Sequence, residues 1–184
     1  MQLEGIRRQY LDGGYHVPHL HKDLASVIDN TAYAIETGER WCVQSSPLAP
    51  ASRAGGDTRT AAVRRGERAS YTWIYPNLMV NAYEGVIDTN LVVPLGVERT
   101  KVIFDYYFAD VADESHARNL ASIAVSEQIQ DEDVAICESV QRGLASRSYD
   151  TGRLSVRREA GEHLFHRLLH ADLKHALDNF SKLR

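Results

Sequence analysis

Alternating apolar residues in two neighbouring segments constrain the fold more than any other feature of this sequence. Between residues 100 and 110, and again between 86 and 94, apolar side chains recur at even spacing. Successive side chains of a β-strand point to opposite faces, so this period indicates antiparallel strands that are covered on one side. The side chains expected on the covered faces are Val102, Phe104, Tyr106 and Phe108 in one strand and Ile87, Leu91 and Val93 in the other.

Helical segments precede and follow this block of strands. We predict an interrupted helical stretch up to about residue 27, a long helix from about 115 to 144 and a last helix from about 161 to 180. The last helix carries one apolar stripe. Its members are Phe165, Leu169, Leu173, Leu177 and Phe180.

The remaining segments complete an α+β pattern. Short strands are expected at 41–44 and near 154–157, and residues 45–68, rich in Ser, Ala, Gly and Arg, predict a long mobile loop. Strands framed by long helices indicate an antiparallel sheet with the helices packed on one face. We treat residues 1–184 as a single domain, since this length suffices for one core.

Charge and hydropathy exclude several classes of partner. The net charge of −4 gives no basic face for nucleic acid. No apolar run reaches the length of a membrane-spanning helix, and the first ten residues have no apolar core typical of a signal peptide. These observations predict a cytoplasmic protein without a membrane partner.

Three histidines within six residues mark the most informative segment. His16 and His21 are five positions apart, which turns a regular helix through roughly 140° and separates the two side chains. Regular helical spacing favours His16 with His19 instead. Pro18 could distort the helix and so allow His16 and His21 to meet. The local sequence leaves open which pair binds a metal, and whether any does.

Asp133 favours a metal site. It falls on the same helical face as four apolar residues, where a carboxylate is costly unless it is paired or bound to a cation. Its neighbours Asp131 and Glu132 point elsewhere and are expected to be solvated. The four apolar residues are Ile129, Cys137, Val140 and Leu144.

Two histidines and one carboxylate predict a mononuclear centre. This set leaves coordination positions open and is typical of non-haem iron(II) oxygenases. The same side chains could hold zinc with a bound water, which would suit hydrolysis.

Three motifs in the correct order resemble the catalytic domain of Rieske-type oxygenase large subunits, in particular the choline monooxygenase-like branch. Residues 10–18 (YLDGGYHVP), followed by His21, resemble the iron-binding segment. Residues 75–83 (YPNLMVNAY) and 88–96 (DTNLVVPLG) resemble the central sheet. Residues 132–144 (EDVAICESVQRGL) resemble the segment that supplies the carboxylate ligand.

The resemblance implies a helix-grip, START-like fold and an iron(II) site that activates dioxygen to hydroxylate a small quaternary ammonium or aromatic substrate. The family's ligands map onto His16, His21 and Asp133, which makes His19 a bystander. Aromatic and amide side chains on the expected strands could face the substrate, although core packing of a strand explains the aromatic ones better. These candidates are Trp73, Tyr75, Asn77 and Tyr83.

The sequence also departs from the family pattern. The Cys-x-His and Cys-x-x-His ligands of a Rieske iron–sulfur cluster do not occur in these 184 residues, so electrons are expected from a separate protein. The carboxylate that links cluster and iron in many relatives falls at Gly13, and Asp12 could replace it. Gln9 stands where relatives usually carry asparagine. Relatives commonly form trimers, which makes a homo-oligomer a further expectation.

Three functions therefore remain open from the sequence: an oxygenase catalytic domain, a metal-dependent hydrolase on the same scaffold, and a binding domain without turnover.

Overall fold

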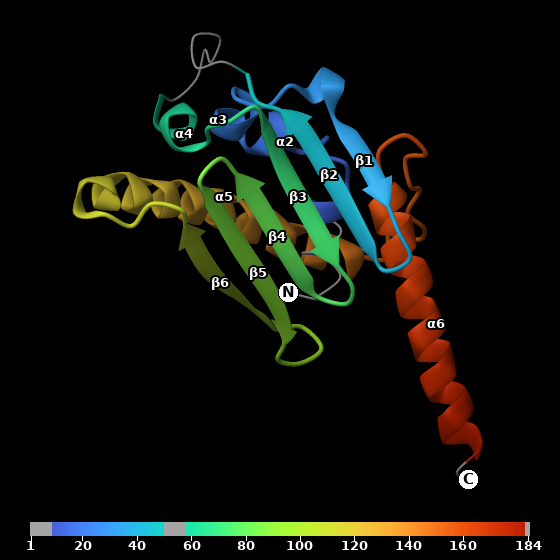
Figure 1. Cartoon of the computed structure of the whole chain (residues 1–184). Helices are drawn as coiled ribbons and strands as arrows, with labels where there is room; N and C mark the ends of the chain where they lie inside the picture. Colours follow the sequence, from blue (N-terminus) through green and yellow to red (C-terminus); the bar gives the residue numbers. More distant parts are fainter. Residues whose placement is uncertain (1–8, 50–57, 183–184) are drawn as a thin grey trace.

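One six-stranded antiparallel sheet forms the centre of the computed structural model, which describes residues 9–49 and 58–182. Each strand pairs with the next along the chain, so the sheet order is β1-β2-β3-β4-β5-β6 (Figure 1). The strands are β1 (Ala34–Thr37), β2 (Trp41–Pro47), β3 (Arg68–Ile74), β4 (Leu78–Tyr83), β5 (Val86–Pro94) and β6 (Thr100–Phe108).

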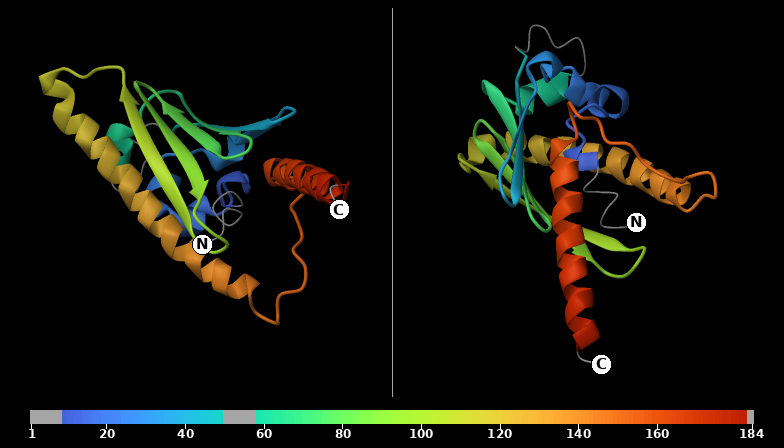
Figure 2. Two further views of the ribbon diagram at one scale, coloured as in Figure 1. Left: turned by 90° about the horizontal axis from the view of Figure 1, so that it is seen from below. Right: turned by 90° about the vertical axis from the view of Figure 1, so that its right-hand side faces the viewer.

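Helices cover one face of this sheet. The long helix α5 runs across that face, whereas the far end of α6 projects beyond the sheet (Figure 2). The α-helices are α2 (Val17–Leu20), α3 (Lys22–Ala25), α4 (Thr58–Val63), α5 (His116–Leu144) and α6 (Ala160–Lys182), and 3-10 turns occupy Asn30–Ala32 and Asp113–Ser115. The predicted α+β class, with an antiparallel sheet and helices on one face, is confirmed. Among the described residues, no helix is both long and apolar enough to cross a membrane.

The main core lies where the start of α6 meets β2 and β3. Trp73 and Phe165 are fully buried, and their ring centroids lie 5.8 Å apart in an edge-to-face arrangement. Leu11 and Cys42 pack into the same cluster. This cluster connects the N-terminal segment, the sheet and α6, and so fixes the chain just before the histidines.

The covered face of β5 is the opposite of the predicted one. Ile87 and Leu91 are exposed, while Asp88, Asn90 and Val92 are buried. The prediction failed because the buried face of β5 carries two polar residues, Asp88 and Asn90, together with Val86 and Val92, so apolar alternation did not mark the covered side. In β6, by contrast, the predicted apolar residues do share the half-buried face.

Two further segments differ from the sequence prediction. Strand β2 continues to Pro47, α4 occupies 58–63 and β3 begins at Arg68, so much of the expected loop at 45–68 is regular; residues 50–57 lie outside the described part. The strand expected near 154–157 is a turn, closed by a hydrogen bond from the Glu159 amide to the Ser155 carbonyl.

The predicted helices at 115–144 and 161–180 are confirmed within a few residues as α5 and α6. The apolar stripe of α6 is buried only at its start, at Phe165. Leu173, Leu177 and Phe180 are exposed, because this part of the helix extends past the sheet.

Two glycines shape the loop that leads to His16. Gly13 and Gly14 have φ values of 73° and 70°, a left-handed conformation that other residues adopt at a cost. A Cβ at Gly13 would lie 2.3 Å from the Arg158 carbonyl oxygen. Gln44 holds the loop from the sheet, because its Oε1 accepts from the Gly13 amide and its Nε2 donates to the Tyr10 carbonyl.

We predict that Gly13→Ala lowers the free energy of unfolding by about 2 kcal/mol or more, through the left-handed backbone and the clash with Arg158. Urea unfolding measures this change. Gly143→Ala is the matched control, since nothing lies within 4 Å of its added Cβ and it sits in α5. Its stability should stay constant or rise by up to about 1 kcal/mol. Equal effects of the two variants would contradict this account of the loop.

Candidate metal centre

A break between two short helices brings His16 and His21 together. His16 immediately precedes α2, and His21 separates α2 from α3 with a non-helical backbone of φ −104° and ψ 73°. Pro18 lies in the first turn of α2, where a missing N–H costs nothing. The expected distortion therefore exists, but it lies at His21 and not at Pro18.

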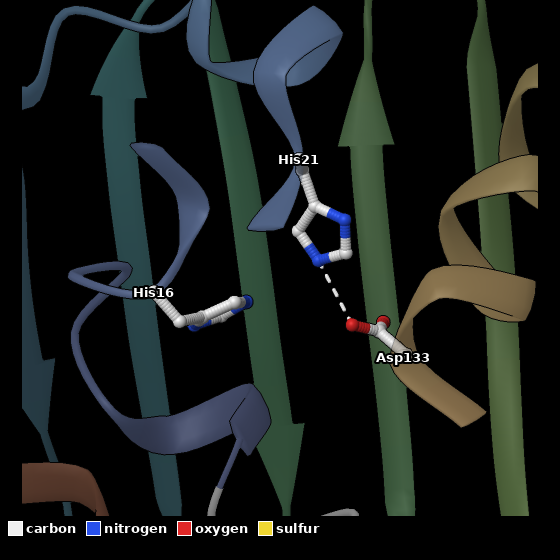
Figure 3. Close-up of side chains that lie close together, drawn as sticks. All are labelled: His16, His21 and Asp133. Carbon is white, nitrogen blue, oxygen red and sulfur yellow. Dashed lines mark ion pairs between the residues drawn. The ribbon is translucent and has the colours of Figure 1, made fainter. Parts of the chain in front are cut away.

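The two imidazoles and the Asp133 carboxylate converge on one point. Each side chain offers a ligand atom, and these atoms all lie within 4.8 Å of one another. His21 Nε2 is 2.8 Å from Asp133 Oδ1, and the His16 and His21 rings are 5.2 Å apart and nearly perpendicular (Figure 3). Within residues 9–49 and 58–182, this is the one His/Cys/Asp/Glu group arranged to hold an ion.

A carboxylate holds the second nitrogen of each histidine. His16 Nδ1 lies 2.6 Å from Asp12 Oδ2, and His21 Nδ1 lies 2.7 Å from Glu132 Oε2. Asp12 is itself fixed by the Gly14 amide, which donates to its other oxygen at 2.8 Å. A neutral imidazole that donates from Nδ1 leaves Nε2 free as a ligand, so both carboxylates favour the tautomer that a metal needs.

Glu132 was predicted to be an ordinary solvated charge, and this is wrong. Glu132 and Asp133 are adjacent on α5, and the His21 imidazole lies between their carboxylates and contacts both. Single-helix geometry could not reveal this contact, because it depends on a second segment.

Asp133 is held from the N-terminal segment as well. Gln9 Nε2 donates to Asp133 Oδ1, and Gln9 Oε1 accepts from the Cys137 thiol. The apolar face predicted around Asp133 is only partly buried: Cys137 is buried, whereas Val140 is exposed. The carboxylate is thus placed by polar contacts more than by surrounding apolar side chains.

The two carboxylates also change the acidity of His21. Burial lowers the pKa of His21, but the hydrogen bonds and negative charges of Asp133 and Glu132 outweigh burial, and the pKa is raised overall. An imidazolium here would donate to both carboxylates. A proton on Nε2 therefore occupies the position that a metal would take. His19, by contrast, is exposed and takes no part in the cluster.

The donor set fits a metal ion. Two ligand atoms that each lie about 2.1 Å from a metal, at right angles, are separated by about 3 Å. The 2.8 Å between His21 Nε2 and Asp133 Oδ1 is close to this value. The charge also fits, because one carboxylate ligand and neutral imidazoles suit a divalent ion with open positions.

A cavity of about 130 Å³ opens beside the three side chains, between the sheet and α5. Apolar groups such as Val17, Leu24 and Ile129 line part of it. The polar lining includes Tyr10, Tyr33, Gln44, Arg64, Tyr71, Asn81, Tyr83, Asp88 and Asn90. A partly open cavity that combines apolar walls with convergent polar groups is typical of a small-molecule site.

Only one of the four side chains predicted to face a substrate lines this cavity. Tyr83 does so, but Trp73 is fully buried in the core and Tyr75 donates to Asp172 on α6. Asn77 donates to the Val92 carbonyl. Trp73, Tyr75 and Asn77 therefore serve packing and sheet structure, because they lie toward the α6 side or at a turn.

Several residues of the site gave no signal in the sequence. Arg64 lay within the expected loop, and Asp88 and Asn90 were placed on the wrong face of β5. Gln9 was noted only as a departure from the family pattern. A buried polar strand face could have been suspected from the alternation of Asp88 and Asn90 with apolar residues.

Residues 6–174 match the family described as the ring hydroxylating alpha subunit, catalytic domain. Among curated relatives, the chloroplastic choline monooxygenases of Arabidopsis thaliana and Beta vulgaris are 44% and 37% identical over 165 residues, 90% of this chain. The chain spans 38% and 36% of the lengths of these two relatives.

Solved structures share the fold. One, described as a quaternary ammonium Rieske monooxygenase that gives insights into carnitine oxidation by gut microbiota and inter-subunit electron transfer, aligns with a TM-score of 0.75. It is 22% identical, and the alignment covers 91% of this chain and 46% of that chain. Another, of the same type with bound L-carnitine, has a TM-score of 0.69 and covers 91% and 44% of the two chains.

We predict that the metal-free protein loses stability as pH rises, owing to His21. Its pKa is raised on folding, so the protonated form contributes stability that is full below the unfolded pKa of about 6.5 and disappears as pH rises through the folded pKa. Chemical unfolding of wild type and His21→Gln between about pH 5.5 and 8.5 measures the difference, which should shrink with rising pH. His19→Gln is the exposed control. A wild-type advantage over His21→Gln that grows with pH would contradict the prediction.

Proposed function

Because this chain belongs to the family of ring-hydroxylating alpha subunit catalytic domains, we propose that it is the mononuclear-iron domain of an oxygenase that hydroxylates a small quaternary ammonium compound. The observation that carries the proposal is the convergence of His16, His21 and Asp133 beside a cavity, all within the matched range. The names of the relatives support the substrate class.

In this proposal His16, His21 and Asp133 hold iron(II), which when bound supplies the redox chemistry for activating dioxygen. Asp12 and Glu132 act as positioning residues, since each keeps a histidine oriented with Nε2 toward the cavity. Gln9 orients the Asp133 carboxylate.

The cavity wall would place and shield the substrate. Val17, Leu24 and Ile129 exclude water near the centre. Tyr10, Tyr33 and Tyr71 offer aromatic surface to a quaternary nitrogen, which cannot donate hydrogen bonds.

Electrons must reach this centre from outside these 184 residues, since they contain neither motif of a Rieske cluster. We propose that an iron–sulfur cluster outside these residues delivers them.

The first prediction concerns the ligands. The purified protein should bind one Fe(II) per chain, and His16→Ala and Asp133→Ala should abolish this binding, because each removes a ligand. His19→Ala, the control from the same segment, should bind as the wild type does. Anaerobic titration with Fe(II) and metal analysis measure this.

Glu132→Gln sharpens the same experiment. It should weaken Fe(II) binding by roughly 10- to 100-fold without abolishing it, as expected for a group that orients a ligand. Equal loss in His19→Ala and His16→Ala, or a preference for zinc that excludes iron, would mean that the ligands or the metal are assigned wrongly.

The second prediction concerns turnover. The Fe(II)-loaded protein, given either peroxide or dioxygen together with a reduced Rieske donor, should oxidise at least one compound among choline, glycine betaine, L-carnitine and γ-butyrobetaine. Mass spectrometry detects the oxidised product. Asp133→Ala should form none. Absence of product from wild type with both oxidant systems would argue against the oxygenase.

A further inference from the structure

Arg64 is a buried cation in the wall of the cavity. It follows α4, and only 5% of its surface is exposed. Its Nη1 donates to Ser122 Oγ at 2.9 Å and its Nη2 to Ser126 Oγ at 2.5 Å, while the guanidinium lies 4.5 Å from the centre of the Tyr83 ring. All of these partners are uncharged.

Among the residues that the structure describes, the Arg64 guanidinium has no ion-pair partner. Its Nε is buried and, within residues 9–49 and 58–182, has no hydrogen-bond partner. A buried charge is costly unless an opposite charge and full hydrogen bonding compensate it. Two hydroxyl groups and one ring face compensate only part of that cost.

Asp88 is a buried acidic group that lines the same cavity. Its Oδ2 accepts from Asn81 at 2.7 Å and from Asn90 at 2.8 Å. Burial raises the pKa of Asp88, whereas the two amides and the positive charge of Arg64 act in the opposite direction. Arg64 and Asp88 thus line one cavity and interact electrostatically, and among the described residues they form no ion pair. Such a cavity suits a ligand that carries both charges.

Helix α5 sets the distance between Arg64 and the metal centre. Ser126 binds Arg64, and Asp133 lies seven residues later on the same side of the helix, so the two are about 10 Å apart along its axis. Both line the same cavity. A ligand anchored at Arg64 and reaching toward Asp133 therefore needs a chain of only a few atoms after the contacts at both ends are subtracted.

We propose that Arg64 binds the carboxylate of the substrate, so that this chain selects carboxylated quaternary ammonium compounds over choline. The planar guanidinium suits a carboxylate, and an anion there would supply the missing charge. The hydroxyl group of choline is uncharged and would leave the guanidinium without a compensating negative charge. The inference rests on the proposed function for the quaternary ammonium part of the substrate, and Arg64 itself assigns only the carboxylate.

Four ligands of similar shape distinguish the effect of the ligand's carboxylate from that of its quaternary ammonium group. Glycine betaine carries a carboxylate where choline carries a hydroxymethyl group. The tert-butylacetate anion and tert-butylethanol repeat that difference with carbon in place of nitrogen. Isothermal titration of the full chain, loaded anaerobically with Fe(II), gives the four affinities without requiring turnover. We expect glycine betaine to bind roughly 10- to 150-fold more tightly than choline, the range for hydrogen bonds to a charged group.

Variants locate the effect. Arg64→Gln should remove the preference for the carboxylate within each ligand pair, and Arg64→Lys should retain part of it through the charge alone. Arg65→Gln is the matched control: it makes the same charge change at the next residue, which is exposed and outside this cavity, and it should leave the preference intact. If Arg64→Gln does not fold, the wild-type comparison within the two ligand pairs still decides.

Choline binding as tightly as glycine betaine, or a carboxylate preference unchanged in Arg64→Gln, would overturn the assignment of Arg64 and leave the proposed function intact. Conversely, Arg64-dependent binding of tert-butylacetate without binding of either ammonium compound would support the carboxylate site. That result would count against the quaternary ammonium substrate of the proposed function.

Discussion

The contact of His21 with both Asp133 and Glu132 is the constraint on which the candidate centre depends. It joins the N-terminal segment to the middle of α5, two parts of the chain more than a hundred residues apart. Both carboxylates are partly exposed, while the imidazole between them is buried. Each surrounding feature serves to deliver His21 to this place: the left-handed glycines, the break between α2 and α3, and Gln44 reaching from β2.

The three carboxylates differ in role because they contact different nitrogen atoms of the imidazoles. Asp12 and Glu132 contact Nδ1 atoms, away from the point of convergence, whereas Asp133 faces Nε2 of His21. In the metal-free protein a proton can bridge His21 and Asp133, and a divalent ion would take its place. A cation would therefore replace a proton at a position where the ligand atoms already converge.

The sequence predicts an element well when the spacing of its apolar residues depends on that element alone. The extents of helices α5 and α6 and the covered face of β6 were predictable from residue spacing, although most of the apolar stripe of α6 is exposed. Strand β5 failed because its buried face lines a polar cavity, so Asp88 and Asn90 lie inside and Ile87 outside. Glu132 failed for a related reason, since its partner comes from another segment. Spacing along one element cannot describe a site assembled from several. His21 over His19 came from family resemblance alone, and the break in the helix at His21 now supplies its physical reason.

The proposed function depends on His16, His21 and Asp133 together binding a single metal ion. A crystal structure of the Fe(II)-loaded protein, with the iron located by anomalous scattering, tests this most directly. The account predicts one iron within about 2.2 Å of Nε2 of His16, Nε2 of His21 and an Asp133 oxygen, with Glu132 still bonded to His21 Nδ1. Iron bound by Glu132 in place of Asp133, or located away from either histidine, would contradict it.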